Sequence, residues 1–110
     1  MKVYQKLVRD KIPEIIKARG DTAVTRVLSD EEFSACLVEK LTEEVQEFLS
    51  DGTVEELADI YEVVLAILRH MDITVESFEE IRKRKLSERG GFLERIFLDA
   101  VIEKKPSMVE

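Results

Sequence analysis

The sequence predicts an all-α fold, an antiparallel helical bundle, and three observations support this prediction. Apolar residues recur at helical spacing over residues 33–48 and again over residues 57–68. Helix-start residues precede three of the expected helices, and glycines follow the expected helix ends. Hydrophobic residues make up 45% of the 110 residues and charged residues 37%, a balance typical of a helix-rich globular protein.

The first element expected is a short helix that begins near residue 12 and ends at Gly20. Pro13 fits the first turn of this helix, where its missing N–H group is harmless. Residues 23–28, AVTRVL, are short and rich in β-branched side chains, so we expect an extended segment or a small strand there.

Two long helices then follow, joined by a tight turn. Ser29 and Glu32 form the signature of a capping box, and the helix behind them should run to about Leu49. Residues 50–52, Ser-Asp-Gly, end it, and Thr53 caps a second helix that runs to about residue 71. Because this second helix is apolar over more than half of its circumference, we expect it at the centre of a bundle or in a dimer interface.

The last expected helix covers residues 75–88, with Thr74 as its cap. Acidic residues come early and basic residues late in this segment, an order that complements the helix dipole. Residues 92–101 could form a final short helix or an extended arm. We therefore expect one helical domain over residues 1–102 and a frayed tail over 103–110, and a chain this small often oligomerises to bury more surface.

Each of the two long helices carries two acids three residues apart, and residues at that spacing share a helix face. They are Glu44 and Glu47 in the first helix, then Glu56 and Asp59 in the second. At roughly 100° per residue, one Glu in each helix falls inside the apolar stripe and the second acid falls at its edge. Isolated carboxylates there would be costly, and four facing carboxylates would repel one another. Divalent cations, which prefer oxygen ligands, resolve both problems, so the pattern predicts a metal site.

Simpler explanations exist for single residues. With Thr53 as cap, Glu56 would occupy the reciprocal position of a capping box, and Glu47 alone would be an ordinary solvated acid. His70 is better explained by a cap or a core contact than by metal ligation. Cys36 suits a small buried position, and core packing is the simplest role for three aromatic residues, Tyr4, Phe92 and Phe97.

The charge distribution narrows the function classes. A formal net charge of −7 argues against a nucleic-acid binder that relies on net charge, but local basic groups could still hold phosphates. The candidates for phosphate binding are five basic residues: Lys6, Arg9, Lys11, Lys85 and Arg89. No stretch reaches the ~18 apolar residues of a membrane span, and the N-terminus leads into charge, so we expect a cytoplasmic protein with no signal peptide.

With these features in hand, the chain resembles the MazG-like, all-α nucleoside triphosphate pyrophosphohydrolases, relatives of phosphoribosyl-ATP pyrophosphohydrolase. The family pattern Glu-x-x-Glu, a spacer, then Glu-x-x-Asp is matched by residues 44–47 and 56–59. KLVRDKIPEII at 6–16, ELADIYEVV at 56–64 and ERGGF at 88–92 are similar to a subgroup labelled phosphoribosyl-ATP pyrophosphohydrolase-like. The resemblance covers roughly residues 4–98, and the chain departs from it in the short spacer between Glu47 and Glu56.

The resemblance implies a bundle of the all-α NTP pyrophosphatase type, completed in a dimer or tetramer. It implies that the four acids hold one or more Mg²⁺ ions, for which Mn²⁺ could substitute, and that one acid, such as Glu47, could orient the attacking water instead. The substrate would be a nucleotide, cleaved between the α and β phosphates to monophosphate and pyrophosphate. Two phosphate-binding candidates, Lys85 and Arg89, could come from a partner subunit.

Two rival hypotheses remain open at this point. One is hydrolysis of phosphoribosyl-ATP itself. The other is a non-catalytic helical module whose acidic groove binds a basic partner or Ca²⁺ without turnover.

Overall fold

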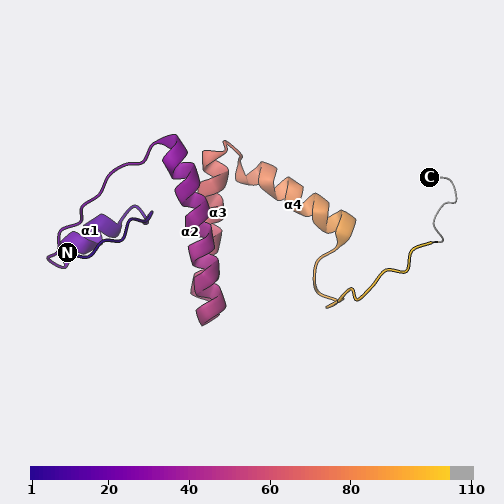
Figure 1. Ribbon diagram of the computed structural model, residues 1–110. Coiled ribbons are helices and arrows are strands. Elements are labelled where there is room, and N and C mark those ends of the chain that lie inside the picture. The colour runs from indigo at the N-terminus through magenta and orange to yellow at the C-terminus, as the bar shows by residue number, and fades with distance from the viewer. Residues whose placement is uncertain (105–110) are drawn as a thin grey trace, which may run out of the picture. The chain divides into compact units, whose positions relative to one another are not determined.

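The computed structural model describes residues 1–104, and over this range the regular secondary structure is entirely α-helical (Figure 1). The helices are α1 (Ile12–Ala18), α2 (Asp30–Asp51), α3 (Val54–His70) and α4 (Val75–Arg89). The chain divides into two compact units, Met1–Phe78 and Glu79–Glu110. The all-α prediction is therefore confirmed, whereas the single domain expected over 1–102 stays a prediction.

Residues 23–28 form neither a helix nor a strand, so of the two alternatives expected there, an extended segment or a small strand, the strand is wrong. β-Branched residues favour an extended backbone, but a strand is stable only when another strand or a packed face supports it. No strand occurs in residues 1–104 with which this segment could pair. Val24 and Val27 accordingly lie exposed in an irregular connection.

Helix α1 matches its prediction closely. Pro13 lies in its first turn, where the proline ring costs no hydrogen bond. The helix ends at Ala18, and Gly20 N–H donates to the carbonyl of Lys17 at 3.0 Å.

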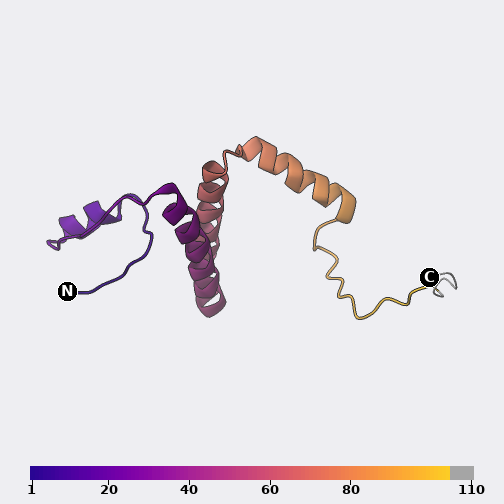
Figure 2. The ribbon, with the colours of Figure 1, turned by 45° about the horizontal axis from the view of Figure 1, so that its top comes forward.

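Helices α2 and α3 form the hairpin that dominates the first unit, and they lie side by side in both Figure 1 and Figure 2. The predicted capping box is present: the Ser29 side chain accepts from Glu32 N–H, and the Glu32 carboxylate accepts from Ser29 N–H. Gly52 ends α2 with a left-handed backbone, φ 64°, which side chains other than glycine adopt at a cost. Thr53 begins α3 with an extended backbone, but its side chain makes no capping hydrogen bond.

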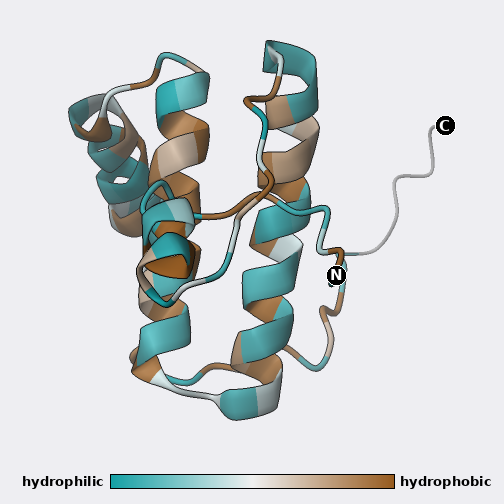
Figure 3. Ribbon diagram, turned by 90° about the vertical axis from the view of Figure 1, so that its left-hand side faces the viewer, coloured by the Kyte–Doolittle hydropathy of each residue, from teal (hydrophilic) through white to brown (hydrophobic). Residues whose placement is uncertain are grey.

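The core of this unit is small. Leu37, Val63 and Leu68 are the buried apolar residues within 1–104, and Phe33 packs edge-to-face against His70 at 5.1 Å between ring centroids. Figure 3 shows apolar residues in brown recurring between hydrophilic residues along the helices. The contact of His70 agrees with the packing role expected for it.

Much of the apolar surface of the hairpin stays exposed. Leu49 at the end of α2, and Val54 and Tyr61 on α3, are examples. The hairpin by itself therefore does not form the complete bundle that the sequence predicts.

Helix α4 begins at Val75, and Thr74 precedes it as the predicted cap, its hydroxyl accepting from Ser77 N–H at 3.1 Å. It ends one residue later than expected, at Arg89, where Gly90 N–H donates to the carbonyl of Leu86 at 2.8 Å. No residue of α4 is buried.

After α4 the described chain forms a turn at residues 93–94 and then continues without regular structure to residue 104. The final short helix, one of the two alternatives for residues 92–101, therefore does not form, and most of the tail expected over 103–110 lies outside the described residues. Tyr4, Phe92 and Phe97 are exposed, so the core packing expected for them is wrong in this chain. Among the described helices, none has the length and apolar content to cross a membrane.

Candidate functional site

The hairpin buries one glutamate from each of its helices. Glu44 of α2 is 7% exposed and Glu56 of α3 is 8% exposed, and they are the buried charged residues within 1–104. In each of them the Oε2 atom is buried and has no hydrogen-bond partner in the described chain. A buried carboxylate oxygen without a partner is costly, because it loses its hydration without compensation. The sequence prediction that one Glu of each helix lies inside the apolar stripe is therefore confirmed.

The surroundings of Glu56 are acidic. Burial raises the pKa of this carboxyl above its ordinary value, and a side-chain hydrogen bond with Asp51 together with the charges of Asp51 and Glu47 raises it further. The last turns of α2 thus bring two acids toward the first turn of α3. The simpler explanation of Glu56, a capping box with Thr53, is not realised because the Thr53 hydroxyl makes no capping bond.

The second acid of each helix is less buried than the first. Glu47 is exposed, and Asp59 is partly exposed. Asp59 Oδ1 accepts a hydrogen bond from Arg9 Nη2 at 2.6 Å. Arg9, a predicted phosphate-binding residue, thus pairs with Asp59, a predicted metal ligand, although 50 positions separate them in the sequence.

A half-buried lysine lies beside Glu44. Lys40 Nζ is 3.2 Å from Glu44 Oε1 and 3.1 Å from Glu43 Oε2. Lys6 Nζ reaches the other oxygen of Glu43, Oε1, also at 3.1 Å. Burial raises the pKa of Glu43, but hydrogen bonds from Lys6 and Lys40 outweigh it, and the net pKa is lowered.

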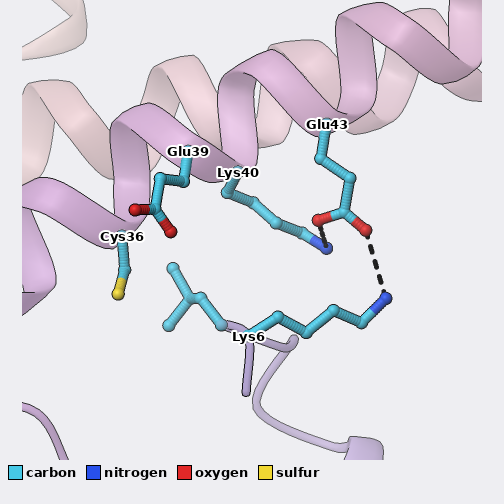
Figure 4. Close-up of a pocket in the computed structure, with 6 residues that line it drawn as sticks. Lys6, Cys36, Glu39, Lys40 and Glu43 are labelled. Atoms are coloured by element: carbon cyan, nitrogen blue, oxygen red, sulfur yellow. Dashed lines mark hydrogen bonds and ion pairs between the residues drawn. The ribbon is translucent and has the colours of Figure 1, made fainter. Parts of the chain in front are cut away.

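These lysines line a pocket of about 240 Å³ between the N-terminal segment and α2. Figure 4 shows Lys6 and Lys40 converging on the carboxylate of Glu43, with Cys36 and Glu39 farther along the helix. Cys36 is a free, half-buried thiol at the wall of this pocket. It is therefore less buried than the sequence analysis expected.

The remaining phosphate-binding candidates lie elsewhere. Lys11 is exposed at the start of α1. Lys85 and Arg89 are exposed on α4, four residues apart and therefore on one face of that helix, and both belong to the second unit. Of the five candidates, Lys6 and Arg9 are thus the two that form ion pairs with acids of the hairpin within the described chain.

The four predicted metal ligands lie on the same hairpin, but their side chains do not form one cluster. Within residues 1–104, no three Asp, Glu, His or Cys side chains are arranged so that they could hold a metal ion. Two buried carboxylate oxygens, Oε2 of Glu44 and Oε2 of Glu56, have no partner in the described chain, and carboxylate oxygen is the donor type that hard divalent cations prefer.

Two residues at this site were not singled out from the sequence, although helical spacing could have found both. Lys40 lies four residues before Glu44, the distance at which opposite charges pair on a helix. Asp51 lies four residues after Glu47 and seven after Glu44, so it continues the acidic face of α2 to the turn.

Comparison with known proteins finds a relative without an assigned function. The chain is similar to an uncharacterised protein of Mycolicibacterium smegmatis, with 55% identity over 47 residues. That match covers 43% of this chain and 48% of the relative, so the chain spans about half the length of the curated relative it matches. No family model matches the chain, and no solved structure matches it.

Proposed function

We propose that this protein is a MazG-like nucleotide pyrophosphohydrolase that depends on Mg²⁺. In this proposal it cleaves a nucleoside triphosphate, or a related nucleotide, between the α and β phosphates and releases a monophosphate and pyrophosphate. The single observation that carries the proposal is the pair of buried glutamates, Glu44 and Glu56, each with an unpartnered Oε2 atom. Buried polar atoms without partners are uncommon in folded proteins, and a bound ion is one of the explanations for them.

The acids of the hairpin have distinct roles in the proposal. Glu44 and Glu56 supply the buried oxygens, and Asp59 binds the cation from the edge. Glu47, which is exposed, either also binds the cation or accepts a hydrogen bond from the attacking water. Bound Mg²⁺, or Mn²⁺ in its place, supplies positive charge for the phosphate oxygens and lowers the pKa of a water molecule.

The basic residues bind the phosphates. Lys6 and Arg9 already lie beside the acids through their ion pairs with Glu43 and Asp59, so a triphosphate at the site would meet both side chains. An arginine can hold a phosphate with two parallel hydrogen bonds, whereas a lysine acts as a point charge. Lys11 of the same chain, and Lys85 and Arg89 of a partner subunit, complete the proposed set.

Oligomerisation is part of the proposal. The hairpin leaves large apolar side chains uncovered on both helices, among them Val38 and Leu49 of α2 and Val54, Leu57 and Tyr61 of α3. Contact with further helices would bury this surface and complete a four-helix bundle of the all-α NTP pyrophosphatase type. A dimer or tetramer would supply those helices.

One observation favours a second candidate, an acidic module that binds a basic protein segment without turnover. Arg9 and Lys40 show that the carboxylates of Asp59 and Glu44 accept basic side chains at 2.6 and 3.2 Å. A basic partner could use the same acceptors.

A nucleotide panel separates the two candidates. The purified protein is incubated with MgCl₂ and with ordinary, damaged and phosphoribosylated nucleotides, and released pyrophosphate is measured. The enzyme should turn over at least one of them, and Glu44→Gln should abolish turnover while the helical circular dichroism spectrum is kept. No Mg²⁺-dependent release from any nucleotide would reject the hydrolase and leave the module.

A further inference from the structure

An apolar arm, residues 92–102, follows α4 in the described chain. Its large side chains lie in solvent: Phe92, Leu93, Ile96, Phe97 and Ile102 are each at least 82% exposed. Scattered apolar residues are normal on a protein surface, but a run of them marks a contact site. The arm is therefore a candidate contact surface.

The spacing within the arm suits a helix that packs on one side. Leu93, Phe97 and Val101 follow one another at intervals of four residues and would share one helix face. Arg95 and Asp99 would fall on the opposite face. The arm has no regular helix in the described chain, as expected for about ten residues without a surface to pack on. Docking would supply that surface.

The α2–α3 hairpin offers a surface of the same kind. Each of its helices carries an exposed apolar stripe at helical spacing: Val38, Val45 and Leu49 on α2, and Val54, Leu57 and Tyr61 on α3. Within residues 1–104 both the stripes and the arm are exposed. Each copy of the protein thus presents two apolar surfaces, and neither is covered.

The charges around these two surfaces are opposite. Helices α2 and α3 together contain twelve acidic residues and two lysine or arginine residues. Residues 82–95, from the last turns of α4 into the arm, contain six lysine or arginine residues and two acids. Two hairpins packed on each other would bring acids together, whereas the arm of another copy brings positive charge to the hairpin. Complementary charge of this kind favours encounter and suppresses the like-charged alternative.

We propose that the C-terminal arm of a second copy covers the apolar stripes of the hairpin, with the basic end of α4 beside the acids of α2 and α3. Two copies that exchange arms in this way form a closed, symmetric dimer. This inference rests on the oligomer in the proposed function, but not on its catalysis. It names the segment that covers the hairpin.

The first test is self-association of the full chain, measured by sedimentation. Wild type should form dimers. Leu93→Ser combined with Phe97→Ser should weaken dimerisation by about tenfold or more, because both side chains lose apolar area that docking buries. Asp99→Ser is the matched control on the opposite face of the arm and should change the dissociation constant by no more than about twofold. No residue of the arm is buried in the described chain, so these changes leave the core of the hairpin intact.

The second test detects the exchange itself. In a Cys36→Ser chain, which has no other cysteine, Asp99→Cys carries a nitroxide spin label on the arm. This chain, without isotope, is mixed with ¹⁵N-labelled Cys36→Ser chain and left to exchange subunits. Amide signals of Leu57 and Tyr61 in the ¹⁵N chain should broaden, because the label reaches them only from the other copy. The amide of Lys17 in α1 is the internal reference and should stay sharp.

The outcomes separate the inference from the rest of the account. Dimers that persist in the Leu93→Ser and Phe97→Ser chain, or hairpin amides that stay sharp beside the label, would overturn the arm exchange and leave the oligomer standing. A monomeric wild type would overturn both. Pyrophosphate release from the nucleotide panel tests the catalysis separately, since the exchange requires no turnover.

Discussion

The α2–α3 hairpin and helix α4 are both rich in acids, but they use them in opposite ways. Helix α4 buries none of its residues, and Glu79 pairs on the surface with Arg82, whose Nε donates at 2.7 Å. The hairpin instead buries Glu44 and Glu56 and leaves one oxygen of each without a partner. The number of acids in a helix therefore says little about function, whereas a buried acid with an unpartnered oxygen marks a candidate functional position.

The acids of the two regions also differ in the sign of their effect on folding stability. Surface ion pairs such as that of Glu79 contribute little to stability and are screened by salt. A buried carboxyl with a raised pKa, such as Glu56, makes the folded state less stable at neutral pH. Proteins retain costly groups of this kind where function requires them.

The largest expected effect contrasts turnover in the two regions. If the proposed function holds, Glu56→Gln should lower Mg²⁺-dependent pyrophosphate release by about 100-fold or more, because it removes one of the buried carboxylates proposed to bind the cation. Glu80→Gln on α4 changes the same residue type at an exposed position and should leave the rate within about twofold of wild type. Equal losses in both variants would mean that the burial of Glu56 has no catalytic meaning.

The next effect concerns stability and pH. The folded-state pKa of Glu56 is raised above the ordinary value of 4.5, so the folded state holds the proton more tightly than the unfolded state. Stability contributed by this group is therefore full below pH 4.5 and is lost as the pH rises through the folded-state pKa. Glu56→Gln should then raise the free energy of unfolding at pH 7, and the gain should vanish near pH 4 in urea titrations.

Mg²⁺ should reverse the order of stability of wild type and Glu56→Gln at pH 7. At a concentration tenfold above its dissociation constant, a ligand that binds only the folded state adds about 1.4 kcal/mol to stability. Wild type should gain this amount at pH 7, and Glu56→Gln should gain much less. A variant that is less stable than wild type at pH 7 without Mg²⁺ would contradict the uncompensated burial of Glu56.

A smaller effect tests whether Glu56 is merely a capping residue. Ser29→Ala removes the side-chain acceptor of the capping box of α2 and should cost about 1 kcal/mol. Thr53→Ala removes a hydroxyl that makes no capping bond, so its cost should be clearly smaller. If thermal unfolding shows equal costs, Thr53 and Glu56 form a capping box in solution, and the contrast between Glu56 and the acids of α4 weakens.

The smallest effect belongs to α4. The hydrogen bond from Arg82 lowers the pKa of Glu79, so the stability it contributes is present at neutral pH and is lost as the pH falls through the folded-state pKa, below 4.5. Glu79→Gln should therefore be slightly less stable than wild type at pH 7 and equal to it at low pH, the opposite trend to Glu56→Gln. High salt should erase the difference at pH 7, and persistence of the difference in about 1 M NaCl would contradict a surface ion pair.

Much of the hairpin could be predicted from the sequence, because the capping residues, the turn glycine and the apolar spacing all indicate the same two helices. The capping box at Ser29, the left-handed turn at Gly52 and the burial of Glu44 and Glu56 all follow from helical spacing and backbone preference. The strand expected at residues 23–28 failed because β-branched side chains do not make a strand without a partner. The alternative explanation of Glu56, a capping box with Thr53, failed because the Thr53 hydroxyl makes no capping bond to the helix.

The partners of the acids were harder to predict. The contact of Arg9 with Asp59 joins residues 50 positions apart, and no local pattern indicates it. Lys40 follows helical spacing, but the same spacing also places lysines beside acids on solvated helices, so spacing alone could not identify its burial. The exposure of Tyr4, Phe92 and Phe97 was missed because their hydrophobicity does not reveal how little core the chain offers.

The most direct test of the central claim is a crystal structure of the protein soaked in MnCl₂, with anomalous diffraction recorded near the manganese edge. The buried glutamates of α2 and α3 should bracket an anomalous peak, with Glu44 and Glu56 oxygens at bonding distance of about 2.2 Å. A map in which manganese binds only at exposed acids, with both buried carboxylates left without a cation, would contradict the account.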